Sequence, residues 1–498
     1  MGISPCQMHQ LDQAVAMASF TYVADVWFML ICRDMGEERF RGFIGTARKL
    51  STVQCMATTA VTGVLHTSAS DVMEVHANLL PIELMFNKVC HRATLRLVAL
   101  LETHPLFKPV WQSAQRLIKR HWSPLHHLFH AFNMRPSDCE TIAPSVCPPN
   151  EDRAVRLHVA STREESRVED VEDEADVRVY SDGSGIEGMA GTAAVLFWDG
   201  HEAKSIRYRL SPLTWHTTYE AEAVGVLLAV ELVRRECGVR SATIRLDNQA
   251  VMQALGGCSA KLAQALLNLV HEGCGDWLDG DRRGRRQLSI NWVSGHNRVH
   301  SNKRTDEEAR KVVSEGSSPE AELLEPLQEC TLPCSLAALG GKFKKMLKHR
   351  WKAMWAKSPQ KGRMDKIDDK LPSHSFLMAT SQLTRAQASI LMQLRTGYIP
   401  LNYFLHKIGK VDSPTCPTCQ TADETVHHYL LDCPGFTHEC HSLAQAMGQN
   451  SKSMQHLLGN WCAYKALLKY VRTTGRFKDT YGDLPMHLTQ ADVSPPVS

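Results

Sequence analysis

Apolar residues recur at two different spacings along the chain, and the spacing changes near residue 177. In residues 1–134 they recur every three or four positions, most clearly in residues 71–77 and 82–101, where Pro81 precedes the second segment. This spacing places apolar side chains on one face of a helix, and proline is favoured in the first turn of a helix. The sequence therefore predicts a packed helical layer without chemistry of its own in residues 1–134.

Residues 177–315 instead alternate short apolar runs with longer amphipathic segments. Runs rich in β-branched and aromatic residues, bounded by glycine, predict strands. The predicted strands are residues 177–180, 191–198, 203–210, 241–246 and 288–293. The predicted helices are residues 217–235, segments that continue to residue 278, and residues 301–313. This order predicts an α/β domain over residues 177–315.

Two segments have the composition of linkers. Residues 135–176 contain several prolines, and residues 164–176 hold eight acidic side chains against one arginine. Such a run of like charge favours a solvated, extended chain. A second domain boundary is predicted at residues 316–340, at the start of a linker and basic helical region over residues 316–410. Residues 441–498 are predicted to form a helical segment and then a disordered tail after residue 493, where Pro495 and Pro496 lie.

Composition narrows the class of protein. A chain of 498 residues with 43% hydrophobic and 22% charged residues predicts two to four globular domains. The net charge of +3 is too small to indicate nucleic-acid binding by itself. The sequence has sixteen cysteines, and it shows neither a secretory signal nor an apolar stretch long enough to span a bilayer. This combination favours free or metal-bound thiols. We therefore expect an intracellular protein, nuclear or cytoplasmic, that is not bound to a membrane.

Four acidic residues lie where predicted strands end or predicted helices run. Asp182 and Asp247 follow strands, Glu222 lies within the helix at residues 217–235, and Asp306 lies in the first turn of the last helix. Alone, an aspartate at such positions is typical of a turn or of a helix start. The helix face of Glu222 is apolar, and a buried carboxylate is costly unless it is protonated or bound to metal. Glu220 lies on a more polar face and is predicted to be an ordinary surface charge.

The four carboxylates, together with the order of strands and helices, resemble ribonuclease H type 1. The resemblance implies a mixed five-stranded sheet with helices on both faces. It implies a metal-dependent endonuclease that hydrolyses the RNA strand of RNA–DNA hybrids with two Mg²⁺ or Mn²⁺ ions, which stabilise the attacking and leaving oxygens at phosphorus. The metal ligands it implies are Asp182, Glu222, Asp247 and Asp306.

The same resemblance implies further site residues. His296, on the loop after the last strand, corresponds to a histidine that assists proton transfer or product release. Thr217, Thr218 and Gln249 correspond to positions that contact the hybrid, and their hydroxyl and amide groups suit sugar and base edges. Trp277 is a candidate aromatic platform for the DNA strand.

A second group of residues has the types and spacing of zinc ligands. The pattern is CxxC-x8-H-x4-C within residues 411–440, formed by Cys416, Cys419, His428 and Cys433. Three thiolates and one imidazole close a tetrahedral Zn²⁺ site without an open position, which predicts one structural ion. His427 is an alternative third ligand, and Cys440 and His441 are possible substitutes. The segment resembles the zinc-binding motif found downstream of reverse transcriptases.

Residues 341–357 contain seven lysines or arginines, no acid, and Phe343, Trp351 and Trp355. This pattern suits phosphate contacts combined with base stacking. It equally suits an amphipathic helix in which Phe343, Leu347 and Trp351 pack inward.

The order of these parts resembles the C-terminal portion of a non-LTR retrotransposon polyprotein, to about residue 485. The resemblance implies that residues 1–134 are the helical region that follows the polymerase. The expected activity is hybrid cleavage, with an RNA–DNA hybrid as the partner. The alternative is a catalytically inactive retroelement remnant that binds nucleic acid through its zinc motif and basic helix.

Overall fold

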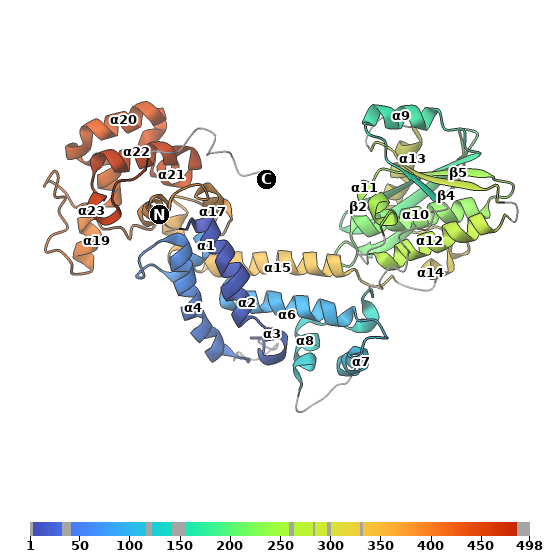
Figure 1. The fold of residues 1–498 in the computed structure, drawn as a ribbon, viewed down its shortest axis with the longest axis horizontal. Coiled ribbons are helices and arrows are strands. Elements are labelled where there is room, and N and C mark those ends of the chain that lie inside the picture. Colours follow the sequence, from blue (N-terminus) through green and yellow to red (C-terminus); the bar gives the residue numbers. More distant parts are fainter. Residues whose placement is uncertain are drawn as a thin grey trace. The chain divides into compact units, whose positions relative to one another are not determined.

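The computed structural model describes residues 3–31, 41–115, 122–141, 155–257, 263–281, 284–295, 300–328 and 332–485. The chain divides into two compact units (Figure 1). The first comprises Met1–Cys90 and Met346–Ser498, and the second comprises His91–Lys345. Within the described ranges, no helix combines the length and the apolar character needed to cross a membrane.

The second unit is built on a six-stranded mixed sheet with the spatial order β1-β6-β5-β2-β3-β4. The strands are β1 Val155–His158, β2 Val177–Ile186, β3 Met189–Trp198, β4 His201–Pro212, β5 Ser241–Leu246 and β6 Gln287–Trp292. β2, β3 and β4 pair antiparallel, whereas β2, β5, β6 and β1 pair parallel. The predicted mixed α/β sheet is confirmed, but it has six strands instead of five, because β1 adds to the edge beside β6.

Helices lie on both faces of this sheet, as predicted. The helices of the unit are α7 Phe107–Gln115, α8 Pro124–Phe132, α9 Arg163–Val171, α10 Thr218–Arg235, α11 Gln249–Leu255, α12 Gln264–Asp279, α13 His300–Glu315 and α14 Glu325–Gln328. A Cβ atom on Gly225 of α10 would meet the Thr192 side chain, and one on Gly191 would meet Val312 of α13. Successive residues of a strand point to opposite faces. α10 and α13 therefore cover opposite faces of β3.

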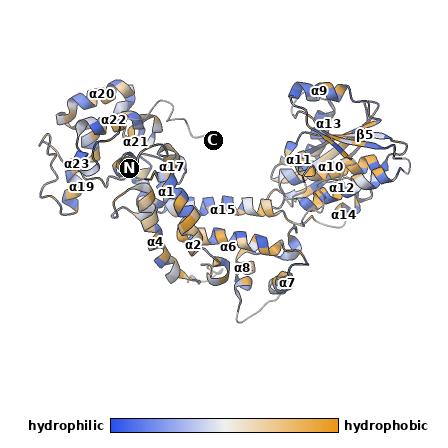
Figure 2. Ribbon diagram, in the orientation of Figure 1, coloured by the Kyte–Doolittle hydropathy of each residue, from blue (hydrophilic) through white to orange (hydrophobic). Residues whose placement is uncertain are grey.

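The hydrophobic core of this unit lies mainly between the sheet, α10 and α12. Its buried members include Val179, Ile244, Leu228 and Val270. Figure 2 shows apolar residues concentrated in the strands and α10, whereas α9 is largely hydrophilic. Trp277 of α12 also belongs to this core and is only 3% exposed. The prediction that Trp277 offers a stacking platform is therefore wrong, because its ring completes the core.

The acidic run before β2 is not extended, contrary to expectation. It contains α9, which Thr162 caps by accepting a hydrogen bond from the Glu165 backbone N–H. Arg245 of β5 is fully buried and pairs with Asp170 at 3.0 Å and Asp173 at 2.7 Å. Tyr180 Oη also donates to Asp170 Oδ1 at 2.6 Å. The run folds onto the sheet because a buried guanidinium neutralises part of its charge.

The first unit is helical. Its helices are α1 Pro5–Leu11, α2 Met17–Phe20, α3 Ala24–Trp27, α4 Ile44–Thr62, α5 Ser70–Ala77, α16 Lys361–Met364, α17 Ser375–Ala379, α18 Arg385–Thr396, α19 Asn402–Lys407, α20 Thr437–Met447, α21 Met454–Gly459, α22 Tyr464–Thr474 and α23 Lys478–Tyr481. The boundary between the units falls within α6 Ile82–Val98 and α15 Leu336–Ala356. The helices predicted at residues 71–77 and 82–101 are confirmed as α5 and α6, although α6 ends at Val98, and the tail predicted after 493 lies outside the described residues.

One buried ion pair joins distant parts of the first unit. Arg395 of α18 pairs with Asp368 at 2.8 Å and donates to Tyr464 Oη at 3.3 Å. Its Nε donates to Nε2 of His76 in α5 at 3.2 Å, and the other ring nitrogen of His76 lies 2.7 Å from the Val72 carbonyl oxygen. His76 is fully buried. This arrangement holds the imidazole in its neutral form, with Nδ1 as the donor.

Candidate metal centres

Asp182 and Asp247 lie side by side in register at one edge of the parallel strand pair. The β2–β5 ladder ends at the pair Ser181–Leu246, and each aspartate is the next residue along its strand. β2 continues to Ile186 against β3, so Asp182 lies within a strand. The prediction that Asp182 follows a strand is wrong. Because the carboxyl ends of parallel strands share an edge, the two side chains reach the same space.

Glu222 comes to this edge from α10. Thr217 caps the helix, and Glu220 completes a capping box by accepting from the Thr217 backbone N–H at 2.6 Å. Glu222 then lies in the second turn and faces β2, where Gly183 leaves room for the helix backbone: a Cβ on Gly183 would lie 2.5 Å from Glu222 N. Glu220 is 3% exposed, so the prediction that it is a surface charge is wrong. Its capping hydrogen bonds account for its burial.

The three carboxylates converge. One ligand oxygen from each of Asp182, Glu222 and Asp247 lies within 4.8 Å of the others. Asn248, which the sequence reasoning missed, hydrogen-bonds to Glu222 and also caps α11. Glu222 Oε2 is buried, and no donor in the described part of the chain reaches it. An orphaned carboxylate oxygen inside an acidic cluster fits a bound cation.

Asp306 of α13 lies near enough to Asp182 to help raise the pKa of that carboxyl, but it is not one of the three carboxylates whose oxygens converge. Both oxygens of Asp306 also face Arg310, at 2.9 Å from Nε and 2.8 Å from Nη2. The helix begins at His300, one residue before the predicted start. Asp306 therefore lies in the second turn and not in the first, so the preference of acidic residues for the first turn of a helix does not explain its position.

The electrostatics of the cluster favour a cation. Burial, followed by the charges of Asp247 and Asp306, raises the pKa of Asp182 to about 7. Burial, followed by the charges of Asp182 and Asp247, raises the pKa of Glu222 well above its ordinary value. Like charges in a low-dielectric site cannot all ionise without compensation. A divalent cation would supply that compensation, so the residues present fit the metal that the sequence predicts.

The predicted substrate and proton-transfer residues lie around the cluster or outside the described residues. Thr217 and Thr218 begin α10, and Gln249 begins α11; Thr218 and Gln249 are exposed. His296 is not among the described residues. The residue before it, Gly295, lies against Asp247, because a Cβ there would be 2.5 Å from Asp247 Oδ2. This close approach had no signal in the sequence beyond the glycine itself.

The second candidate centre joins three thiols and one imidazole. One ligand atom from each of Cys416, Cys419, His428 and Cys433 lies within 4.8 Å of the others. Cys416 Sγ is 3.8 Å from Cys433 Sγ, and Cys419 Sγ is 3.3 Å from His428 Nε2. Tetrahedral Zn–S bonds of about 2.3 Å place two sulfurs about 3.8 Å apart. The geometry therefore fits a closed zinc site.

The alternatives that the sequence left open point elsewhere. His427 pairs with Asp432 at 2.7 Å, and its side chain is 60% exposed. Cys440 Sγ contacts the Leu430 carbonyl and Tyr470 Oη, and His441 contacts Gln445. The structure thus brings His428, and none of these three residues, to the thiols.

Thiol acidity around the group is uneven. Hydrogen bonds from the Thr421 hydroxyl and backbone lower the pKa of Cys419 to about 6. Burial raises the pKa of Cys433 to about 12. A cysteine binds a metal ion as the thiolate. A cation at this site would offset the cost that burial imposes on the Cys433 thiolate.

The Cys/His group is part of the core of the first unit. Arg476 makes a two-pronged ion pair with buried Glu424, at 2.6 Å from Nε and 2.7 Å from Nη2. Tyr470 Oη donates to the Tyr429 carbonyl, and Tyr429 packs edge-on against Phe436. The segment that carries the ligands is therefore anchored on α22 and the residues that follow it.

The basic helix predicted at residues 341–357 is α15. Phe343, Leu347, Trp351 and Trp355 are all at most 9% exposed. The inward-packing interpretation is confirmed for these side chains, while the lysines between them are exposed.

Similarity to known proteins is found among solved structures. No family model matches the sequence, and the search of curated proteins gave no match. RNase H1 from the halophilic archaeon Halobacterium salinarum NRC-1 is similar at 22% identity, over 28% of this chain and 97% of its own, with a TM-score of 0.22. An N-terminal RNase H domain from Mycobacterium tuberculosis, solved as a fusion with maltose-binding protein, is similar at 17% identity, over 29% of this chain and 100% of its own, with a TM-score of 0.23.

A third similar structure is LC11-RNase H1, isolated from compost, at 14% identity, over 28% of this chain and 96% of its own, with a TM-score of 0.23. These likenesses concern the fold of less than a third of the chain. The strand order and directions described above follow from the strand pairing of this chain itself.

Proposed function

We propose that the chain hydrolyses the RNA strand of RNA–DNA hybrids with two Mg²⁺ or Mn²⁺ ions. The convergence of Asp182, Glu222 and Asp247 carries this proposal, because their raised pKa values and the orphaned Glu222 oxygen favour cations. Asp306, held by Arg310, is the fourth ligand in the proposal. Bound ions would stabilise charge on the attacking and leaving oxygens at phosphorus.

The chain's own residues would orient these ligands and the substrate. Asn248 holds Glu222, and Gly295 lets the loop after β6 lie against Asp247. We propose that Thr217 and Thr218, at the start of α10, and Gln249, at the start of α11, contact the hybrid. Hydroxyl and amide groups can bond the 2′-hydroxyl that distinguishes RNA from DNA.

A hybrid-cleavage assay on the full chain tests the activity. With Mg²⁺, we expect cleavage of the RNA strand only, and at least a ~100-fold slower rate in Asp182→Asn and in Asp247→Asn, equivalent to roughly 3 kcal/mol of transition-state stabilisation. Asp276→Asn is the matched control, because this α12 carboxylate is 66% exposed and pairs with Arg234 at 3.5 Å. Binding of the hybrid without cleavage by the wild type would favour the non-catalytic alternative.

We also propose one structural Zn²⁺ at Cys416, Cys419, His428 and Cys433. The distances between these ligand atoms and the absence of an open position in a four-ligand set support it. An ion there would join the loop that carries Cys416 and Cys419 to the π-helical turn that begins at His428. Its role would be to stabilise the first unit.

The order of the two centres along the chain supports a proposed origin. A carboxylate-bearing sheet followed by a Cys/His group resembles the C-terminal portion of a non-LTR retrotransposon polyprotein. The proposed activity would then act on the hybrid that reverse transcription produces. Detection of the chain joined to a polymerase in a longer transcript would test this origin.

A further inference from the structure

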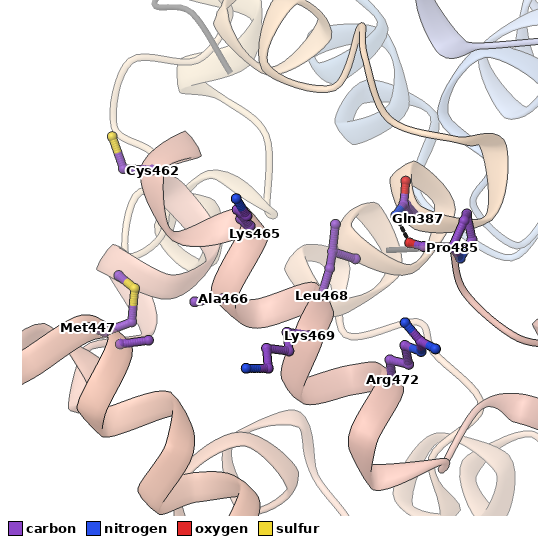
Figure 3. A pocket seen from close by; sticks show the side chains of 10 residues that line it. Gln387, Met447, Cys462, Lys465, Ala466, Leu468, Lys469, Arg472 and Pro485 are labelled. Atoms are coloured by element: carbon purple, nitrogen blue, oxygen red, sulfur yellow. Dashed lines mark hydrogen bonds between the residues drawn. The ribbon is translucent and has the colours of Figure 1, made fainter. Parts of the chain in front are cut away.

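A pocket of about 330 Å³ lies in the first unit, and none of its lining residues belongs to either candidate metal centre (Figure 3). Its lining comes from α22 and the preceding Cys462, from the end of α20, from Gln387 of α18 and from Pro485. Gln387 Nε2 donates to the Pro485 carbonyl at 3.0 Å, which fixes this part of the rim. The pocket is thus built from four separate parts of the chain.

Positive charge lines one side of this pocket. Lys465, Lys469 and Arg472 are spaced i, i+4 and i+7 on α22, so they share one face of the helix. All three are exposed, and no acidic residue lines the pocket. Across the described residues, none of the three side chains forms an ion pair or hydrogen bond. Three unpaired cations on one face repel one another, and an anionic ligand would relieve this repulsion.

The remaining lining is largely apolar. It consists of Ala446, Met447, Cys462, Ala466, Leu468 and Pro485. A flat, weakly polar group would cover this surface, and the polarisable Met447 thioether suits an aromatic ring. Proteins bind single-stranded nucleic acid with a row of cations beside side chains on which bases stack, and here Met447 would take the place of the usual aromatic ring.

We propose that this pocket binds one nucleotide unit of a single-stranded nucleic acid, with its base on the apolar wall and successive phosphates along α22. A volume of about 330 Å³ is small for a ligand pocket and suits one base. At 1.5 Å per residue, Lys465 and Arg472 lie about 10 Å apart along the helix axis. The row of cations therefore extends along the helix past the width of one phosphate, which suits successive phosphates of a strand.

Fluorescence anisotropy with a labelled oligo(dT) 12-mer and the full chain tests the proposal. The triple variant Lys465→Gln, Lys469→Gln, Arg472→Gln should bind more weakly, and its plot of log K against log salt should be shallower by about 2, since each lost phosphate contact removes about 0.7. The advantage of the wild type should then shrink about 16-fold between 50 and 200 mM salt. Ala446→Trp, which fills the pocket and keeps every charge, should also weaken binding.

The matched control is Lys366→Gln, Lys407→Gln, Lys410→Gln, three exposed lysines of the first unit that do not line the pocket, which removes the same charge. An equal loss in this control would overturn the proposal, because net charge would then explain binding. Unchanged binding in Ala446→Trp would overturn the placement of the base. Displacement of the oligonucleotide by dTMP at equal nucleotide concentration, or by poly-glutamate at equal charge, would overturn the assignment to a nucleic-acid strand.

Melting temperatures equal to that of the wild type would confirm that the variants fold. The inference is independent of hybrid cleavage, because the probe is single-stranded DNA and binding is the quantity measured. The chain could therefore bind single-stranded DNA without cleaving hybrids, or cleave hybrids without binding single-stranded DNA at this pocket.

Discussion

Gly183 of β2 lies directly against the backbone of Glu222 in α10: a Cβ atom on Gly183 would lie 2.5 Å from Glu222 N. Neighbouring Asp182 and Glu222 both belong to the carboxylate cluster. The absence of a side chain at residue 183 therefore sets how closely the strand and the helix bring their carboxylates together.

Gly183→Ala is expected to push α10 away from β2 and to lower the rate of hybrid cleavage more than it lowers stability. Overpacking of this kind costs about 1–3 kcal/mol, whereas displaced ligands lose their common cation. Cleavage rate and urea unfolding, measured together, check this. The control is Gly275→Ala on α12, where a Cβ would meet nothing within 4 Å. A Gly183→Ala variant with the wild-type rate would contradict the proposed role of this contact.

The second prediction concerns the acidic helix α9. Replacing Asp170 and Asp173 together by asparagine should lower the free energy of unfolding by about 3–5 kcal/mol, because Arg245 would remain buried without a counter-charge. Glu164→Gln, at an exposed position of the same helix, should change it by less than about 0.5 kcal/mol. Equal effects of the two changes on the free energy of unfolding would show that the ion pairs of Arg245 with Asp170 and Asp173 do not stabilise the fold.

The third prediction distinguishes adjacent histidines. Purified chain should contain one zinc per molecule, and His428→Ala should lose it, because only His428 lies with the three thiols. His427→Ala should retain it, since this side chain is exposed and pairs with Asp432. Elemental analysis measures both, and a chelator should lower the melting temperature of the wild type and of His427→Ala alone. Zinc retained in His428→Ala and lost in His427→Ala would reverse the assignment.

The fourth prediction concerns His76 and pH. Burial and the neighbouring Arg395 lower the pKa of His76 from 6.5 to about 3. The unfolded chain therefore binds a proton that the folded chain rejects, and stability from this group is present above pH 6.5 and lost as pH falls toward 3. The loss approaches ~1.4 kcal/mol per pH unit. His76→Gln should lower stability at pH 7 and flatten the dependence between pH 6.5 and 4, as urea unfolding at several pH values would reveal.

The fifth prediction concerns His296, which we propose moves a proton during cleavage. An imidazole titrates near neutrality, and general acid–base catalysis typically contributes about 10²–10⁴-fold. His296→Ala should slow cleavage by up to that factor and flatten the acid limb of the pH–rate profile. Mg²⁺ affinity, measured by calorimetry, should stay unchanged. Affinity that collapsed would make His296 a ligand, and an unchanged rate at every pH would remove it from the mechanism.

Local patterns in the sequence were enough to single out candidate site residues. The apolar face of α10 identified Glu222 as buried, because helical periodicity depends only on the order of residues. The spacing of Cys416, Cys419 and Cys433 identified a candidate zinc group for the same reason. The order of strands and helices predicted an α/β domain, and the resemblance to ribonuclease H type 1 implied the mixed sheet, which the strand pairing confirms.

Only the tertiary structure decided which distant groups meet. Arg245 pairs with Asp173, 72 residues earlier, and β1 joins β6 from a segment that composition alone marked as a linker. His427 and His428 are equivalent by spacing, but neighbouring residues of a helical turn point about 100° apart, so the packing of Tyr429 in the core selects which one faces the thiols. Sequence periodicity is a local property and reveals faces. The partner of a buried charge depends on how the chain folds back on itself, and no local pattern contains that.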